Sequence, residues 1–217
     1  MDRIVLVRHA QASFGAEDYD KLSPLGHQQS DWLAQYFRAH DLRFDRVFRG
    51  SLRRHRETTQ AVLNHDLAPE PVEDTRFNEI DYDLLEADYL RASGARRAAS
   101  RADFLALFPE IICHWAEHDD VPGHVRYTEF EARVMAALDE AATHSGTTLI
   151  VTSGGVIGTI LRQVLGLTPR MAAELMLNIH NASVHELTRE AGALRLSLFN
   201  ASPHFDPQDR SHARTFI

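Results

Sequence analysis

Short apolar runs alternate with amphipathic stretches along most of the chain. Residues 4–7 (IVLV) and 147–152 (TTLIVT) are such runs, and each stops abruptly at polar residues. Runs of this kind are typical of strands buried on both faces of a parallel sheet. A third, shorter strand is predicted at residues 46–50. The pattern therefore predicts a sheet whose central strands are covered on both sides.

Helices are predicted between these strands from capping signals and apolar periodicity. Ser23-Pro24 places a serine at the N-cap and a proline at the first helical position, where its missing N–H does no harm. The residues that then share one helical face are Trp32, Leu33, Tyr36 and Phe37. Further helices are predicted over residues 52–64, from the capping box Thr128-Glu129-Phe130-Glu131 to near Gly146, and from the glycine pair after Ser153 to Gly166.

Two segments near the end, residues 182–189 and 193–199, read as an antiparallel pair, and residues 68–73 (APEPVE) are extended because of their prolines. Strands that alternate with helices, plus one hairpin, predict an α/β three-layer sandwich with a mostly parallel sheet flanked by helices. Residues 80–127 contain an apolar helix that is interrupted at Pro109. We interpret this segment as a lid or insertion within one domain that spans residues 1–217.

Composition and charge limit the partners. The chain has 23 basic and 31 acidic residues and a net charge of −8, which argues against nucleic acid or an anionic membrane surface as the main partner. Cys113 is alone, so no intrachain disulfide can form and a reducing compartment is indicated. No apolar run approaches the roughly 20 residues that span a bilayer. We expect a soluble cytoplasmic protein, for which a homodimer is one of the oligomeric states that the sequence allows.

The strand at residues 4–7 ends in Arg8-His9-Ala10, which places an imidazole beside a fixed cation. Open α/β sheets bind their ligands just beyond the carboxyl ends of their strands. An isolated Arg-His pair is more often just the place where a strand stops, so the functional interpretation depends on the rest of the chain.

Four further segments carry the same chemistry: LSPLGHQQ at 22–29, RGSLRRHRETTQAV at 49–62, FNEIDY at 77–82 and LIVTSGGVIG at 149–158. Together with the Arg-His pair, and in this order, they resemble the histidine phosphatase superfamily, also called the phosphoglycerate-mutase-like family. The resemblance covers most of the chain and leaves residues 84–127 unmatched. It implies the phosphoglycerate-mutase-like fold and phosphoryl transfer at the strand ends.

The resemblance implies a role for each matching residue. His9 falls on the imidazole that attacks phosphorus and becomes a phosphohistidine. Arg8 and Arg54 fall on guanidinium groups that clamp the phosphate oxygens, and Glu79 falls on the group that protonates the leaving alkoxide and then activates water. No metal and no organic cofactor is implied.

Arg54, the second predicted phosphate-binding arginine, has two other arginines close to it in the sequence. The family spacing to Leu52 and Thr58 puts the match on Arg54. We interpret Arg53 and Arg56 as residues of a solvated helix face.

Two positions depart from the family pattern. Ala10 replaces a glycine, which is tolerable unless the position needs a positive φ. Ser153 replaces a histidine that donates to the phosphoryl oxygens, and a serine hydroxyl donates one neutral hydrogen bond at shorter reach. The site is then a weakened phosphatase with Ser153 as a phosphate-binding residue, a phosphatase with a substitute donor such as His180, or a phosphate binder without turnover.

Other interpretations have less support. Thr152-Ser153-Gly154 resembles the nucleophile elbow of serine hydrolases, but Val151 stands where that elbow needs glycine. Two clusters of polar residues could form binding sites, but a solvated helix surface is the commoner explanation for each. One has metal-like spacing and consists of His114, His118, His124, Asp119 and Asp120, and the other has the charge to meet a second anionic group on a substrate and consists of Arg91, Arg96, Arg97 and Arg101.

The expected function is a phosphatase that hydrolyses small phosphate monoesters through a phosphohistidine at His9. The alternatives are a non-catalytic phosphate-ester-binding protein of the same fold and a phosphoglycerate-mutase-type phosphotransferase. The identity of the substrate would depend on residues 80–127.

Overall fold

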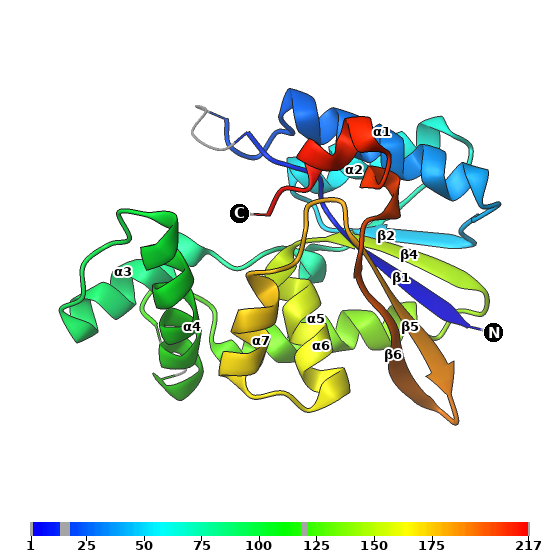
Figure 1. The fold of residues 1–217 in the computed structure, drawn as a ribbon. Helices are drawn as coiled ribbons and strands as arrows, with labels where there is room; N and C mark the ends of the chain where they lie inside the picture. The colour runs from blue at the N-terminus through cyan, green and yellow to red at the C-terminus, as the bar shows by residue number, and fades with distance from the viewer. Residues whose placement is uncertain (1, 14–17, 119–120, 217) are drawn as a thin grey trace.

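The computed structural model describes residues 2–13, 18–118 and 121–216 (Figure 1). Six strands form one sheet within these ranges, in the order β3-β2-β4-β1-β5-β6. The parallel part consists of β1 (Arg3–Arg8), β2 (Arg46–Arg49), β3 (Val72–Glu73) and β4 (Thr147–Thr152). The antiparallel part is the hairpin of β5 (Val184–Glu190) and β6 (Ala193–Ala201), in which β5 pairs with β1. The prediction of a mostly parallel sheet with one hairpin is confirmed.

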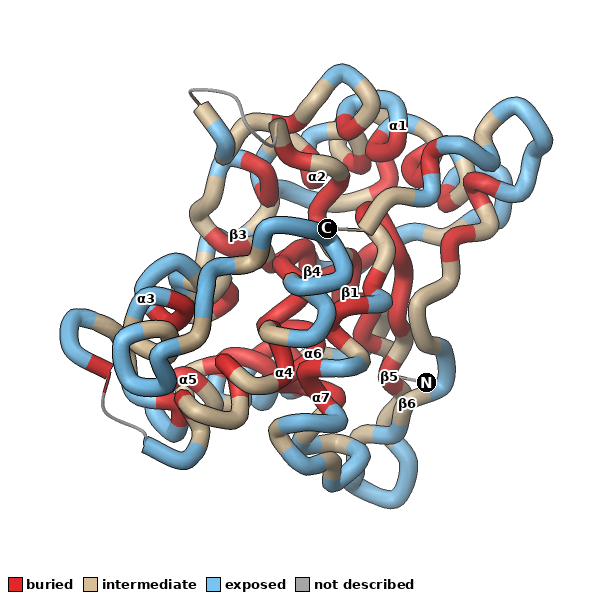
Figure 2. Tube along the Cα trace, turned by 60° about the vertical axis from the view of Figure 1, so that its left-hand side comes forward, coloured by how far each residue is buried: buried red, intermediate tan, exposed pale blue. Residues whose placement is uncertain are grey.

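Helices cover both faces of the sheet (Figure 1). One face carries α1 (Pro24–Ala39) and α2 (Arg53–Asn64), and the other carries α5 (Tyr127–Ala141), α6 (Gly154–Leu165) and α7 (Pro169–Met176). Alternate residues of β1 serve the two sides, because Ile4 and Leu6 pack into one hydrophobic cluster while Val5 and Val7 pack into the other. Figure 2 shows the central strands buried along most of their length. This two-sided burial is the reason for the uninterrupted apolar run.

Shorter elements complete the chain. A 3-10 helix at Thr75–Phe77 follows β3, and two more, at Pro203–Phe205 and Gln208–Ala213, follow β6 near α1. In the part of the chain that the structure describes, no helix is long and apolar enough to cross a membrane.

The start of α1 follows its sequence signal. The Ser23 side chain accepts a hydrogen bond of 3.0 Å from the Gly26 N–H, and Pro24 occupies the first helical turn. The predicted capping box of α5 is wrong. The helix begins at Tyr127, with Arg126 as its N-cap, so Thr128 lies inside the first turn. At this first position the Tyr127 ring is buried in the core, 5.0 Å from the Trp115 ring.

Two helices, α3 (Tyr82–Ser93) and α4 (Arg101–His118), lie to one side of the sheet and its covering helices (Figure 1). The predicted interruption at Pro109 is wrong, because α4 continues through this residue. Proline removes one backbone hydrogen bond from a helix interior, and here its ring is buried among the residues that hold α4 in place. That residues 80–127 act as a lid, within one domain over residues 1–217, stays a prediction.

Candidate functional site

The carboxyl ends of β1, β2 and β4 meet at one edge of the sheet, because these strands run parallel and adjacent. The pairing continues past the last strand residue, since the His9 N–H donates to the Thr152 carbonyl at 2.8 Å. Arg8 and His9 follow β1, Arg54 lies in the first turn of α2 after β2, and Gly154 and Gly155 open α6 directly after β4. Segments far apart in the chain therefore contribute to one site.

The His9 imidazole is held in one tautomer. Its Nδ1 lies 2.8 Å from the Ala10 carbonyl oxygen, which can only accept, so Nδ1 carries the proton. Its Nε2 keeps its lone pair and accepts a hydrogen bond of 3.2 Å from the Arg54 Nε–H. Burial, followed by the positive charges of Arg54 and Arg8, holds the pKa of His9 well below its usual value. The ring is therefore a neutral imidazole with an unprotonated Nε2, whose lone pair accepts from Arg54 in the resting site.

Two guanidinium groups flank this nitrogen. Arg54 is buried and forms an ion pair of 2.6 Å with Asp20, which is partly exposed. Arg8 donates to the Ile179 carbonyl, while its buried Nε has no hydrogen-bond partner among the described residues. Burial lowers the pKa of Arg8, and the charge of Glu79 opposes that shift. An oxyanion beside His9 would find one unsatisfied donor on Arg8 and a second guanidinium on Arg54.

Glu79 faces the same space from the segment that precedes α3. Its carboxylate accepts hydrogen bonds of 3.0 Å from the Gly155 N–H at the start of α6 and 3.0 Å from the Ile80 N–H. A Cβ on residue 155 would stand 2.2 Å from Glu79 Oε1, so this close approach requires a glycine. The Glu79 side chain is thus fixed at the N-terminus of α6, beside the cavity.

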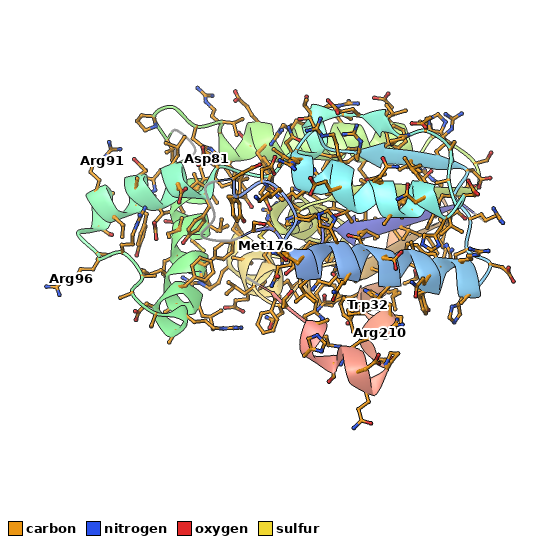
Figure 3. The ribbon with its side chains drawn as sticks, turned by 90° about the horizontal axis from the view of Figure 1, so that it is seen from above. Trp32, Asp81, Arg91, Arg96, Met176 and Arg210 are labelled. Atoms are coloured by element: carbon orange, nitrogen blue, oxygen red, sulfur yellow. The ribbon has the colours of Figure 1, made fainter. Side chains whose placement is uncertain are left out.

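These four side chains line one cavity of about 630 Å³. The remaining wall comes from α2, α3, α4, α6, α7 and the loops between them, and consists of Tyr19, Leu52, Ile80, Asp81, Tyr82, Asp83, Phe104, Phe108, Gly154, Gly155 and Met176. Asp81 and Met176 lie on opposite sides of the space between the α3–α4 pair and the rest of the molecule (Figure 3). The structure thus brings Arg8, His9, Arg54 and Glu79 together.

Ser153 is not among the residues that line the cavity. It is fully buried, and its Oγ shares a hydrogen bond of 2.7 Å with Nε2 of His55, which is also fully buried. The His55 ring lies 5.7 Å from the His9 ring. Its Nδ1 has no partner among the described residues, and a Cβ on residue 50 would come within 2.3 Å of it. A side chain longer than serine at residue 153 would therefore meet His55.

His55 was not singled out by the sequence analysis. It lies between two arginines of α2, and 98 positions separate it from Ser153, so no local pattern indicates their contact. Burial, followed by the charge of Arg54, holds the pKa of His55 well below its usual value, and the ring is neutral. His180, the candidate named from the sequence, lies outside the cavity wall, with its Nδ1 3.4 Å from the Ser202 hydroxyl.

Ala10 fits its position. Its φ is not positive, and its N–H donates to the Thr58 hydroxyl at 3.0 Å. Arg53 and Arg56 are exposed, as the sequence indicated for a solvated face, and Arg53 pairs with Asp18 and Glu57.

The histidine-rich segment shows no metal-like arrangement where it is described. His114 pairs with Asp88, while the Nδ1 atoms of His118 and His124 bond to backbone carbonyls. The described residues contain no group of three side chains suited to hold a metal ion. Asp119 and Asp120 lie outside the described residues.

Comparison with known proteins adds a family and a fold. The sequence model of the histidine phosphatase superfamily (branch 1) matches residues 4–202. Phosphoglycerate mutase from Bacillus anthracis has a TM-score of 0.71 at 17% identity, over 93% of this chain and 94% of that one. A mutant phosphoserine phosphatase from Entamoeba histolytica, in complex with phosphoserine, has a TM-score of 0.65 at 19% identity, over 94% and 99%.

A mycobacterial glucosyl-3-phosphoglycerate phosphatase also has a TM-score of 0.65, at 21% identity, over 92% of this chain and 99% of that one. Comparison with curated protein sequences gives no match. At these identities the structural likeness shows the fold, and it confirms the phosphoglycerate-mutase-like sandwich.

Proposed function

The chain belongs to the histidine phosphatase superfamily, and on this premise we propose that it hydrolyses small phosphate monoesters through a phosphohistidine on His9. The observation that carries the proposal is the state of the His9 ring. Its Nδ1–H donates to the Ala10 carbonyl, and its unprotonated Nε2 accepts from Arg54 beside the cavity that Arg8, Arg54 and Glu79 also line. A neutral imidazole with an unprotonated Nε2 between two guanidinium groups is suited to attack an electrophile that carries negative charge, once the Arg54 N–H turns from Nε2 to the oxygens of that electrophile.

In the first step His9 Nε2 attacks the phosphorus atom in line with the leaving oxygen. The P–N bond forms, the P–O bond to the alcohol breaks, and a protonated Glu79 gives its proton to the departing alkoxide. Arg8 and Arg54 bind the phosphoryl oxygens. Arg54 then leaves both Asp20 and His9 Nε2 for the more highly charged phosphate, which releases the Nε2 lone pair for the attack.

In the second step Glu79, now a carboxylate, takes a proton from water. The hydroxide attacks phosphorus, the P–N bond breaks, and inorganic phosphate leaves with His9 restored as the neutral imidazole. The hydrogen bonds from the Gly155 and Ile80 N–H groups hold the carboxylate in place between the two steps. Ser153 acts through His55 as a positioning residue for the ring of His9.

The experiment is a rapid mixing of the protein with a ³²P-labelled monoester, followed by an alkaline quench. The label should remain on the wild-type protein in a base-stable, acid-labile form, and His9→Ala should abolish both this label and turnover. His118→Ala, an exposed change on α4, is the matched control and should keep both. Turnover that survives His9→Ala refutes the proposal.

A phosphate-ester-binding protein without turnover is the second candidate. It is favoured by one observation, that the Ser153 hydroxyl bonds to His55 and supplies no donor to the cavity wall. Calorimetric titration with inorganic phosphate separates the two candidates. Micromolar binding with no labelled protein and no released phosphate would favour this second candidate.

A further inference from the structure

Resting on the proposed function, we infer that the site selects monoesters of aromatic or similarly apolar alcohols that carry no second negative charge. The inference comes from the part of the cavity that would surround the leaving group. Three aromatic side chains stand there: Tyr82 at the start of α3, and Phe104 and Phe108 on α4. Their ring centroids are 5.5–5.6 Å apart, and Tyr82 and Phe108 are stacked.

Apolar side chains extend this aromatic wall. Leu52, Ile80 and Met176 line the same cavity from the start of α2, the segment before α3 and the end of α7. Burial raises the pKa of Tyr82, so its hydroxyl stays neutral and the wall carries no phenolate charge. A flat apolar group removed from water against this wall gains hydrophobic and ring–ring stabilisation.

The basic side chains of the cavity are gathered at one end, with Glu79, and the charged side chains described near the aromatic wall are acidic only. Among the described lining residues the basic ones are Arg8 and Arg54, and both lie at the phosphate end beside His9. Asp81 and Asp83 are also lining residues, near the aromatic wall. The stretches outside the described residues, 14–17 and 119–120, contain no lysine or arginine. A carboxylate on the leaving group would therefore lie near two carboxylates without a cation to pair with it.

The arginine cluster in the last turn of α3, the following loop and the first turn of α4 leaves no unpaired cation at the aromatic wall. Arg97 is near enough for its charge to act on Tyr82, but it is already paired with Glu86 at 2.8 Å. Arg101 lies over the Phe216 ring. Arg91 and Arg96 point away from the body of the molecule (Figure 3). The prediction that these residues form a solvated surface thus agrees with their positions. A buried anion without a partner is costly, so an ester with a second negative charge should be a poor substrate.

The test compares two esters that differ by one carboxylate. The value of kcat/KM should be at least about tenfold higher for benzyl phosphate than for 4-carboxybenzyl phosphate, in line with the selectivity of apolar pockets. Phosphoserine and 3-phosphoglycerate should also be poorer than benzyl phosphate. Equal or inverted values would overturn the inference.

Variants locate the selectivity. Phe104→Ala should lower kcat/KM for benzyl phosphate about tenfold and leave phosphoserine nearly unchanged, whereas Leu105→Ala, the neighbouring residue outside this cavity, should change neither. Asp83→Asn should raise kcat/KM for the carboxybenzyl ester and not for the benzyl ester. A Phe104→Ala variant that keeps the full preference for benzyl phosphate would contradict the role of the aromatic wall.

Failure of this inference is distinguishable from failure of the proposed function. Benzylphosphonate and 4-carboxybenzylphosphonate cannot be hydrolysed, so their affinities report the cavity without any turnover. Tighter binding of benzylphosphonate, at least about tenfold, supports the inference even if no ester is cleaved. Turnover of esters together with equal affinities for the two phosphonates would refute the inference and leave the proposed function intact.

Discussion

Replacement of Ser153 by histidine tests whether the space beside His9 is already filled. Ser153 and His55 are both 0% exposed and their polar atoms are 2.7 Å apart, so a new imidazole at residue 153 has no room while His55 remains. We expect Ser153→His to lower stability and turnover together. Had Ser153 simply left a vacant position, the same change would raise turnover instead.

The size of the effect follows from packing and hydrogen bonding. Overpacking of a buried site costs about 1–3 kcal/mol, which lowers the Tm of a chain of this size by roughly 2–12 °C. His55→Ala should also destabilise, because it leaves a buried hydroxyl without its partner at a cost of about 1–3 kcal/mol. The double variant Ser153→His with His55→Ala exchanges one ring for another. It should recover about half of the summed loss of the two single variants, through a favourable coupling of about 1–3 kcal/mol.

Thermal melts and steady-state hydrolysis of 4-nitrophenyl phosphate measure both quantities on the four proteins of this cycle. In the double variant the new imidazole can reach the phosphate site, and an added preorganised donor there is worth about 10²–10³-fold in turnover. A single Ser153→His variant with wild-type stability and higher kcat would refute the reasoning. Additive stabilities in the double variant would refute it as well.

Three further predictions concern the clamp, the carboxylate and a buried histidine. Arg54→Ala should weaken binding of inorganic phosphate by about 2–5 kcal/mol in calorimetric titration. Arg56 is exposed on the same helix, and Arg56→Ala should leave the affinity unchanged. Equal affinities of the two variants would mean that Arg54 does not bind the anion. Gly155→Ala should displace the Glu79 carboxylate, since the new Cβ would lie 2.2 Å from Oε1. It should lower kcat about 10²–10⁴-fold with little change in Tm, and an unchanged kcat would contradict this. Burial lowers the pKa of His204 to about 3 from 6.5, so the unfolded chain binds a proton first and stability falls as the pH drops below 6.5. At pH 5 this histidine should cost about 2 kcal/mol, and denaturant melts of His204→Leu should show that loss removed.

The sheet could be predicted from the sequence because its signals are local. Residues 4–7 are apolar at every position since alternate side chains pack into cores on opposite faces, and Ser23-Pro24 caps a helix by contacts within four residues. The predicted helix interruption at Pro109 and the predicted capping box at Thr128 were wrong for the opposite reason. In both cases the core, through the buried Pro109 ring and the contact of Tyr127 with Trp115, outweighed the local preference.

The candidate site was predictable only in part. The family resemblance located Arg8, His9, Arg54 and Glu79, and the structure brings them to one cavity. It could not indicate that His55 meets Ser153 or that Gly155 holds Glu79, because 98 and 76 positions separate these pairs. Such contacts arise from the parallel packing of strands and are absent from any local pattern.

The two guanidinium groups link the resting site to its proposed chemistry. Their positive charge adds to the effect of burial in holding the pKa of His9 low, so the imidazole stays neutral in the resting site. When a phosphate dianion binds, the same charges are neutralised by its oxygens, and the effect on the ring weakens as the P–N bond forms. The resting site therefore keeps its nucleophile deprotonated, and the occupied site stabilises the cationic ring that attack on phosphorus creates. This reversal needs Arg54 near Nε2, where the structure places it at 3.2 Å.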